Sequence, residues 1–200
     1  MRICITLDDV LRAKTMQFGK IYKKYIDQNI NLEELDLSSG NLQNIFGFED
    51  KKEYERFLYE DYAFEIFGEA PECDKMLSKT LNLWLLRLED DDDIAEQGID
   101  LILSNTMEFN QSIGCTHFFL SRIAPRIRKT FFPKDSNEIW DVCDILITAD
   151  KKLLANKPEG KIVIRINTDY NKNTQCVYQY DSLMAFLKDD EIINKLFKKE

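Results

Sequence analysis

Several patterns that mark nucleotide-dependent enzymes and nucleophilic hydrolases are missing from this chain. Glycine is scarce, with seven residues, and no GxGxxG or P-loop pattern is present, which argues against a dinucleotide or nucleoside-triphosphate fold. The single histidine, His117, has no partners that predict a catalytic triad, so we interpret it as a surface or partly buried helix residue. The five cysteines are scattered and odd in number, and we expect reduced thiols in a cytoplasmic protein.

Long apolar runs and clustered positive charge are also lacking. No apolar run approaches the roughly 20 residues of a membrane helix, and Asp8 and Asp9 interrupt the N-terminal apolar stretch, so we expect neither a membrane span nor a signal peptide. The net charge of −9 argues against nucleic-acid binding, because phosphate backbones require clustered Lys and Arg. A small phosphorylated ligand needs only a local basic pocket. The acidic run at 89–93 is interpreted as a solvated helix end or loop.

Short apolar segments alternate with helical patterns along the chain. Apolar runs predict buried strands at residues 2–7, 99–105, 130–132, 144–148 and 161–167. Apolar residues at helical spacing predict helices at 10–28, 51–67, from Pro71 through Leu85, and at 111–127, 182–187 and 191–197. This alternation predicts an α/β fold whose parallel sheet is covered by helices on both faces.

The segment between the first two predicted strands is too long for a simple crossover helix. We interpret residues 13–90 as the first helix plus an inserted, mostly helical cap, and residues 1–12 and 91–200 as the core. The aromatic residues of this segment are interpreted as the core of the cap, with stacking on a nucleobase and a protein interface as alternatives. They are Phe46, Phe48, Tyr54, Phe57, Tyr59, Tyr62, Phe64 and Phe67.

Polar residues follow the ends of the predicted strands. In open parallel sheets, ligands bind at the carboxyl ends of the strands. We therefore expect one site to collect the residues that lie at these ends. They are Thr6, Asp8, Ser104, Asn105, Lys134, Thr148, Ala149 and Asp150.

This order resembles the four motifs of the haloacid dehalogenase-like (HAD) phosphohydrolases, whose first strand ends in Asp-x-Asp-x-[Thr/Val]-Leu. Residues 6–11, Thr-Leu-Asp-Asp-Val-Leu, match that pattern except at its first position. Segments 144–148 and 161–167 are most similar to the 5′(3′)-deoxyribonucleotidase group. The resemblance implies a HAD-like Rossmannoid core of three α/β/α layers, with a small helical cap inserted after the first strand.

The resemblance also implies roles for individual residues. Asp8 matches the general acid/base that protonates the leaving alkoxide. Ser104 matches the hydroxyl that hydrogen-bonds a phosphate oxygen, and Asn105 follows it. Lys134 matches the lysine that neutralises the phosphate, with Lys129 as a competing candidate.

Two motifs depart from the family pattern. The first aspartate of the family is the nucleophile that forms an aspartyl-phosphate, and Thr6 occupies its position here. The fourth motif of the family holds Mg²⁺ with paired acids, but this chain has Thr148 and Ala149 there. Asp8 and Asp150 are the remaining candidate ligands for Mg²⁺, which prefers octahedral oxygen ligation at short distances.

These departures favour a HAD-like pseudoenzyme without phosphatase activity. Such a protein would bind a phosphorylated small molecule or a protein partner, a second copy of itself included. The alternative is a Mg²⁺-dependent phosphatase or 5′-nucleotidase with shifted ligands. That alternative predicts that Asp8, Asp9 and Asp150 converge around one ion.

Overall fold

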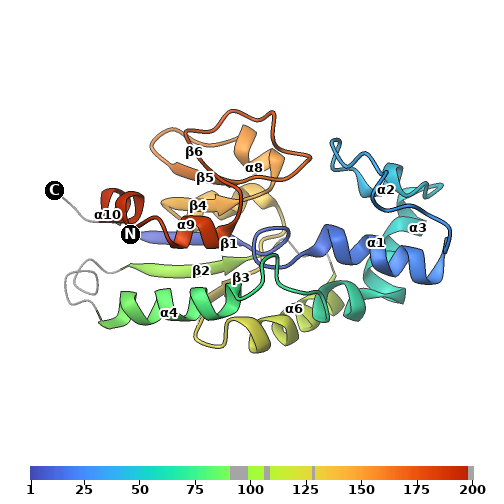
Figure 1. Ribbon diagram of the computed structural model, residues 1–200, viewed down its shortest axis with the longest axis horizontal. Coiled ribbons are helices and arrows are strands. Elements are labelled where there is room, and N and C mark those ends of the chain that lie inside the picture. The colour runs from blue at the N-terminus through green and yellow to red at the C-terminus, as the bar shows by residue number, and fades with distance from the viewer. Residues whose placement is uncertain (91–98, 106–108, 128, 198–200) are drawn as a thin grey trace.

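A six-stranded parallel sheet forms the centre of the molecule (Figure 1). The computed structural model describes residues 1–90, 99–105, 109–127 and 129–197. Across the sheet the strand order is β3-β2-β1-β4-β5-β6, so β1 lies at the centre between β2 and β4. The strands are β1 (Arg2–Thr6), β2 (Asp100–Ser104), β3 (Lys129–Phe131), β4 (Ile145–Thr148), β5 (Ile162–Ile166) and β6 (Tyr178–Tyr180).

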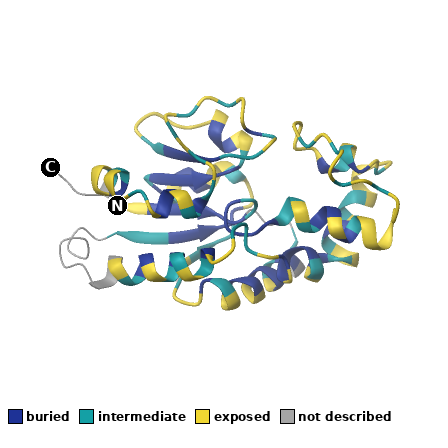
Figure 2. Cartoon of the chain, in the orientation of Figure 1, coloured by how far each residue is buried: buried dark blue, intermediate teal, exposed yellow. Residues whose placement is uncertain are grey.

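The central strands are buried on both faces, as a parallel sheet between two helical layers requires. In β1 the side chains of Ile3 and Ile5 point to one face and that of Cys4 to the other, and all three are fully buried. Figure 2 shows this buried centre beneath helices whose outer sides are exposed. The five predicted strands and the α/β class are confirmed. The sixth strand, β6, was not predicted, because its three residues form an edge strand without an apolar run.

Each face of the sheet has its own helical layer and its own apolar cluster. On the Ile3 face, buried side chains come from α4 (Leu77–Asp90), α6 (Asn110–Ile123), α9 (Leu183–Leu187) and α10 (Asp190–Phe197). On the Cys4 face they come from α7 (Ile139–Val142) and α8 (Lys151–Ala155), and the short helix η3 (Ser136–Glu138) precedes α7. The three layers therefore follow from the alternation of apolar side chains along each strand.

A separate group of short helices lies beyond the carboxyl ends of the strands (Figure 1). It comprises α1 (Lys14–Tyr25), α2 (Leu42–Ile45), α3 (Lys51–Glu55) and two π-helical turns, η1 (Arg56–Asp61) and η2 (Phe64–Gly68). Their buried side chains form a third, aromatic-rich cluster that also includes Cys115 of α6. The predicted boundary between core and cap stays a prediction, and the buried residues of α4 belong to the cluster of the sheet.

Two predicted helix starts were wrong. Helix α1 begins at Lys14 instead of residue 10, because the N–H groups of Leu11 and Arg12 donate to the Leu7 carbonyl in a tight turn. Helix α4 begins at Leu77 instead of Pro71. The segment after Pro71 instead pairs with the first turn, since the Pro71 carbonyl accepts from the Ala13 N–H at 3.0 Å.

Several smaller predictions also have an outcome. All five cysteines are free, in agreement with the predicted thiols. His117 is exposed on α6 with its ring against Phe132, as expected for a surface residue. Residues 91–93 of the acidic run lie outside the described residues. None of the described helices combines the length and the apolar composition that a membrane span requires.

Candidate functional site

A cleft of about 900 Å³ opens at the carboxyl ends of the strands. Its volume lies in the range of small-molecule sites, roughly 300–1,000 Å³. The sequence-predicted residues that line it are Thr6, Asp8, Ser104, Asn105, Lys134 and Asp150. Further lining residues come from the cap and from the loop after β5, among them Lys14, Ser39, Tyr54, Tyr59 and Tyr170. The structure therefore brings six of the eight predicted residues to one cleft, and their roles remain predictions. Thr148 and Ala149 are fully buried and do not line it.

Two threonines face each other where the central strands end. The Thr6 hydroxyl donates to Thr148 Oγ1 at 2.9 Å, and both residues are buried. Thr148 Oγ1 also accepts from the backbone N–H of Asp150 at 3.0 Å. The pairing follows from the sheet order, because β1 and β4 are adjacent parallel strands. A pair of neutral hydroxyl groups therefore lies at the adjacent ends of β1 and β4, and Thr6 of this pair lines the cleft.

Asp8 forms an ion pair with a fully buried arginine. Arg12 Nε and Nη2 both donate to Asp8 Oδ1, at 2.9 and 2.5 Å. The Lys14 ammonium lies 3.3 Å from the other carboxylate oxygen. Burial by itself raises the pKa of Asp8, but the charges of Arg12 and Lys14 outweigh burial and hold that pKa below its ordinary value. Asp8 is therefore held as an anion.

Arg12 is fixed on every side. Its Nη1 donates to the Phe67 carbonyl at 3.2 Å and to the Thr116 hydroxyl at 2.9 Å. Its guanidinium lies over the rings of Phe67 and Phe119, 5.0 and 5.5 Å from their centroids. The side chain is 0% exposed, so a buried cation from the turn after β1 supports the carboxylate of Asp8 from below the cleft.

Asp9 uses its carboxylate to join three segments. Its backbone adopts φ 57°, a left-handed conformation that Asp tolerates better than most residues. One carboxylate oxygen accepts from the Thr15 N–H at 2.9 Å, and the other from the Thr15 and Tyr170 hydroxyls at 2.5 and 3.0 Å. Burial raises the pKa of Asp9. The residue thereby fastens the start of α1 and the loop after β5 to the strand end.

Asp150 caps a helix. Its carboxylate accepts from the backbone N–H groups of Lys152 and Leu153 at 2.7 and 3.2 Å, as an N-cap side chain does. Within the described parts of the chain, no three Asp, Glu, His or Cys side chains form a group able to hold a metal ion. Asp8, Asp9 and Asp150 line the same cleft, yet each has separate partners. The donor set at the strand ends therefore does not fit Mg²⁺, which needs several anionic or carbonyl oxygens around one point.

The end of β2 contributes groups suited to an oxyanion. Asn105 is 7% exposed, and its Nδ2 has no hydrogen-bond partner among the described residues. Because an unpaired buried donor costs free energy, this amide is a candidate for ligand contact. Ser104 beside it is fully buried. Lys134 is exposed at the rim of the cleft. Lys129, the other candidate for the phosphate-neutralising lysine, has its Nζ 2.6 Å from Asp100 Oδ1, at the opposite end of β2.

Three functional candidates, Lys14, Tyr170 and Arg12, lacked a clear signal in the sequence. Lys14 and Tyr170 line the cleft, but Tyr170 contacts Asp9 across 161 positions of the chain. Arg12 contacts Phe67 and Thr116, which lie 55 and 104 residues away in the sequence. The only local signal was the spacing of Asp8 and Arg12, four residues apart, which is a common distance for ion pairs.

No protein-family model matches the sequence, and no curated protein matches it. The structure is similar to that of a haloacid dehalogenase-like hydrolase from Bacteroides fragilis, with a TM-score of 0.56 and 12% identity over 92% of this chain and 98% of that one. The HAD-hydrolase YfnB from Bacillus subtilis, solved with bound magnesium, aligns with a TM-score of 0.49 and 15% identity over 99% and 98% of the two chains. The chain thus has the HAD-like α/β fold.

Proposed function

We propose that this protein retains the HAD-like fold without its phosphoryl-transfer chemistry, and that its cleft binds a phosphorylated small molecule without a divalent metal. The hydrogen bond between Thr6 and Thr148 carries the proposal. The resemblance implies a nucleophilic carboxylate at the position of Thr6 and a metal-binding acid at the position of Thr148. A threonine hydroxyl without an adjacent base is a weak nucleophile, and two neutral hydroxyls supply no negative charge for Mg²⁺.

The partners of Asp8 support the same proposal. A general acid has to carry a proton near the working pH before it gives that proton to a leaving alkoxide. The charges of Arg12 and Lys14 lower the pKa of Asp8 below its ordinary value, so the protonated form is scarce near neutral pH. Asp8 in this arrangement is a structural anion that orients two cations.

Phosphate binding is supported by hydrogen-bond donors in the lining of the cleft. The Lys14 ammonium and the Asn105 amide both belong to the lining of the cleft, and the amide donor is unpaired among the described residues. Lys134 lies at the rim and forms no ion pair with a described residue. Hydrogen bonds from charged or amide donors to phosphate oxygens are strong. These side chains replace the charge neutralisation that a metal provides in other phosphate sites.

The proposal is tested by calorimetric titration of the full chain with AMP and with inorganic phosphate, first in EDTA and then with Mg²⁺. We expect binding in EDTA and the same affinity with Mg²⁺. Asn105→Asp should abolish binding, because it replaces an amide donor with a negative charge. Asn194→Asp, an exposed residue of α10, is the matched control and should bind like the wild type.

A turnover assay separates the proposal from the phosphatase alternative. Wild-type protein with Mg²⁺ should not hydrolyse a panel of nucleoside monophosphates and small phosphate esters above background. Mg²⁺-dependent turnover that disappears in a folded Asp150→Asn variant would overturn the proposal. The absence of any AMP or phosphate binding in the wild type would overturn it as well.

A further inference from the structure

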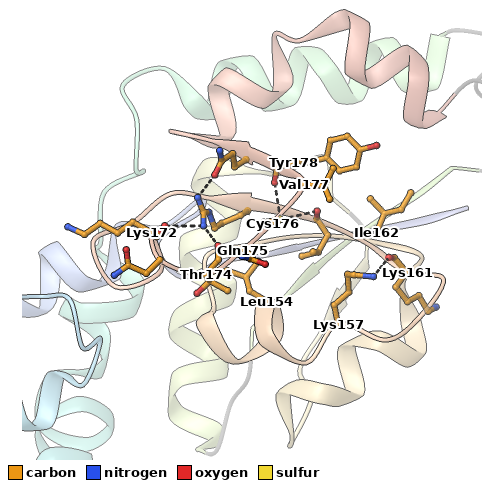
Figure 3. A pocket seen from close by; sticks show the side chains of 14 residues that line it. Leu154, Lys157, Lys161, Ile162, Lys172, Thr174, Gln175, Cys176, Val177 and Tyr178 are labelled. Carbon is orange, nitrogen blue, oxygen red and sulfur yellow. Dashed lines mark hydrogen bonds between the residues drawn. The ribbon is translucent and has the colours of Figure 1, made fainter.

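A second hollow lies on the far side of the loop that follows β5. It has a volume of about 790 Å³ and is bounded by α8, β5, β6 and the loop at 167–177. We call it the basic groove and define it by three rim lysines, Lys157, Lys161 and Lys172, and three floor residues, Leu154, Val163 and Cys176. Figure 3 shows Lys157 and Lys161 at one end and Lys172 at the other, with Leu154 and Cys176 between them. None of these residues lines the cleft at the strand ends.

The charge of the basic groove is opposite to that of the molecule. Its lining contains four cationic side chains and no acidic one, although the chain carries a net charge of −9. The Lys157 ammonium donates to the carbonyls of Pro158 and Lys161, at 3.3 and 3.0 Å, and meets no carboxylate among the described residues. Lys172 lies 3.8 Å from the exposed Asp169, a pairing that is weak in water.

The fourth cation, Arg165, is buried, and no carboxylate of the described residues pairs with it. It is 5% exposed, and its guanidinium donates to neutral oxygens only, among them the Asn167 side chain at 2.9 Å and the Asn171 carbonyl at 3.3 Å. The Thr174 carbonyl and the Gln179 side chain also accept from it. Hydrogen bonds satisfy its donors, but no described carboxylate neutralises its charge. A buried charge without a partner costs free energy, and a bound anion would offset that cost.

The floor of the basic groove is apolar. Leu154 and Val163 belong to the cluster between the sheet and α8, and the Cys176 thiol packs against that cluster. Val177, at the edge of the groove, is 88% exposed, an unusual state for a large apolar side chain. Leu154 and Val163 are themselves buried, so Val177 presents most of the exposed aliphatic surface. A small hydrated anion would leave Val177 in water, whereas an organic anion with an apolar part would cover it and gain about 25 cal/mol per Å² of apolar area.

We propose that the basic groove binds an amphipathic organic anion. Its carboxylate or phosphate group lies near Lys157, beside Lys161, whose ammonium also lies 3.6 Å from Asp144 Oδ1, and its apolar body covers Val177. The geometry that carries this proposal is a cationic rim around an apolar floor, within the field of the uncompensated charge of Arg165. The groove is separate from the cleft, so this proposal stands or fails independently of the proposed function.

Fluorescence titration of the full chain with 8-anilinonaphthalene-1-sulfonate tests this site, since the probe joins an anionic group to an apolar ring system. N-phenyl-1-naphthylamine, which has the same rings without the sulfonate, is the control ligand. We expect saturable binding of the sulfonate and roughly tenfold weaker binding of the neutral analogue, the effect of one charge-assisted contact. Displacement by decanoate or by decyl phosphate then distinguishes a carboxylate from a phosphate ligand.

Variants assign the probe to the groove. Lys157→Met keeps the aliphatic stem and should weaken sulfonate binding roughly fivefold. Val177→Asp places a negative charge at the rim of the groove and should abolish binding. Because the Val177 side chain is 88% exposed, the substitution removes little packing from the fold. Lys20→Met, an exposed residue of α1, should bind like the wild type. The proposal would be overturned if all three variants bound the sulfonate probe with wild-type affinity. It would also be overturned if the wild type bound the two probes with equal affinity.

Discussion

At the scale of single residues, Arg12 determines what the cleft can do. Its guanidinium is buried beneath the strand ends and holds the Asp8 carboxylate as an anion, with Lys14 on the other oxygen. Replacing one member of a buried pair leaves the other charge uncompensated, which is more damaging than losing the pair as a whole. The stability of the turn after β1 and the charge of the cleft therefore depend on the same contact.

We predict that Asp8→Asn lowers the free energy of unfolding by about 3 kcal/mol at neutral pH, because Arg12 loses its counter-ion. Urea denaturation checks the value. Asp27→Asn, an exposed residue beyond α1, is the control and should change stability by less than about 0.5 kcal/mol. A neutral result for Asp8→Asn would mean that the ion pair contributes nothing to the fold.

The same pair predicts a pH dependence. The folded-state pKa of Asp8 is lowered, so its contribution to stability is complete above the unfolded pKa of about 3.9 and is lost as the pH falls through the folded value. The difference in stability between wild type and Asp8→Asn should therefore be constant above about pH 5 and shrink below about pH 4. Denaturation curves across this range measure it. A difference that grows on acidification would contradict the assignment.

Replacing the two threonines with the acids that the resemblance implies tests whether their hydroxyls exclude Mg²⁺. Thr6→Asp/Thr148→Asp would place two carboxylates where hydroxyls now lie 2.9 Å apart. Their repulsion should lower the unfolding temperature in EDTA, and Mg²⁺ should restore much of the loss, because a cation relieves like charge. The neutral Thr6→Asn/Thr148→Asn variant should show no response to Mg²⁺. Unfolding temperatures with and without Mg²⁺ test this prediction. A strong Mg²⁺ response in the wild type would contradict the interpretation of Thr6 and Thr148 as a neutral pair that does not bind the ion.

At the scale of elements, the loop between β5 and β6 separates the cleft from the basic groove. Asn171 organises this loop: its Nδ2 donates to the carbonyls of Ala149 and Ile166 at 2.9 and 2.8 Å, and its Oδ1 accepts from the Thr168 N–H at 2.9 Å. The residue is fully buried. The loop that lines both the cleft and the basic groove is therefore held in place by the Asn171 side chain.

We predict that Asn171→Ala destabilises the protein by about 2–3 kcal/mol, since it leaves buried backbone groups without partners. Asn173→Ala, an exposed neighbour in the same loop, should be close to neutral. Urea denaturation compares the two. Limited proteolysis should show faster cleavage between β5 and β6 in the first variant alone, and equal cleavage would contradict the role of Asn171.

The elements also show what the sequence could predict. Apolar runs marked β1, β2, β4 and β5 because a buried parallel strand has no polar face, and polar residues at their ends located Thr6, Ser104 and Asp150. The starts of α1 and α4 were missed because they depend on backbone contacts between the turn after β1 and the segment near Pro71. Tyr170 was missed for the same reason, since its partner Asp9 lies 161 residues away.

At the scale of the whole molecule, apolar clusters stabilise separate parts of the chain. Two lie on the faces of the sheet, and a third belongs to the aromatic group beyond the strand ends. Phe18 is central to the third cluster, with its ring centroid 5.0 Å from that of Phe46 and 5.2 Å from that of Phe57. The short helices of this group are too short to be stable alone, so the aromatic packing holds them.

We predict that Phe18→Ala lowers the free energy of unfolding by about 3–5 kcal/mol and acts first on residues 14–67. Hydrogen exchange should show lost protection there before any loss in the sheet. Met16→Ala changes a half-exposed neighbour on α1 and should leave protection unchanged. Uniform loss across the sheet and the aromatic group would mean that the molecule unfolds as one unit.

The strand order has a consequence for how the chain is made. β1 leaves the ribosome early, yet its two neighbours, β2 and β4, begin at Asp100 and Ile145. At about 5–20 residues per second, translation of the intervening residues before β2 takes roughly 5–20 s. For that interval β1, with apolar Ile3, Cys4 and Ile5, lacks both neighbouring strands. The centre of the sheet can therefore be completed only after β4 has been translated, and these apolar side chains are exposed to aggregation until then.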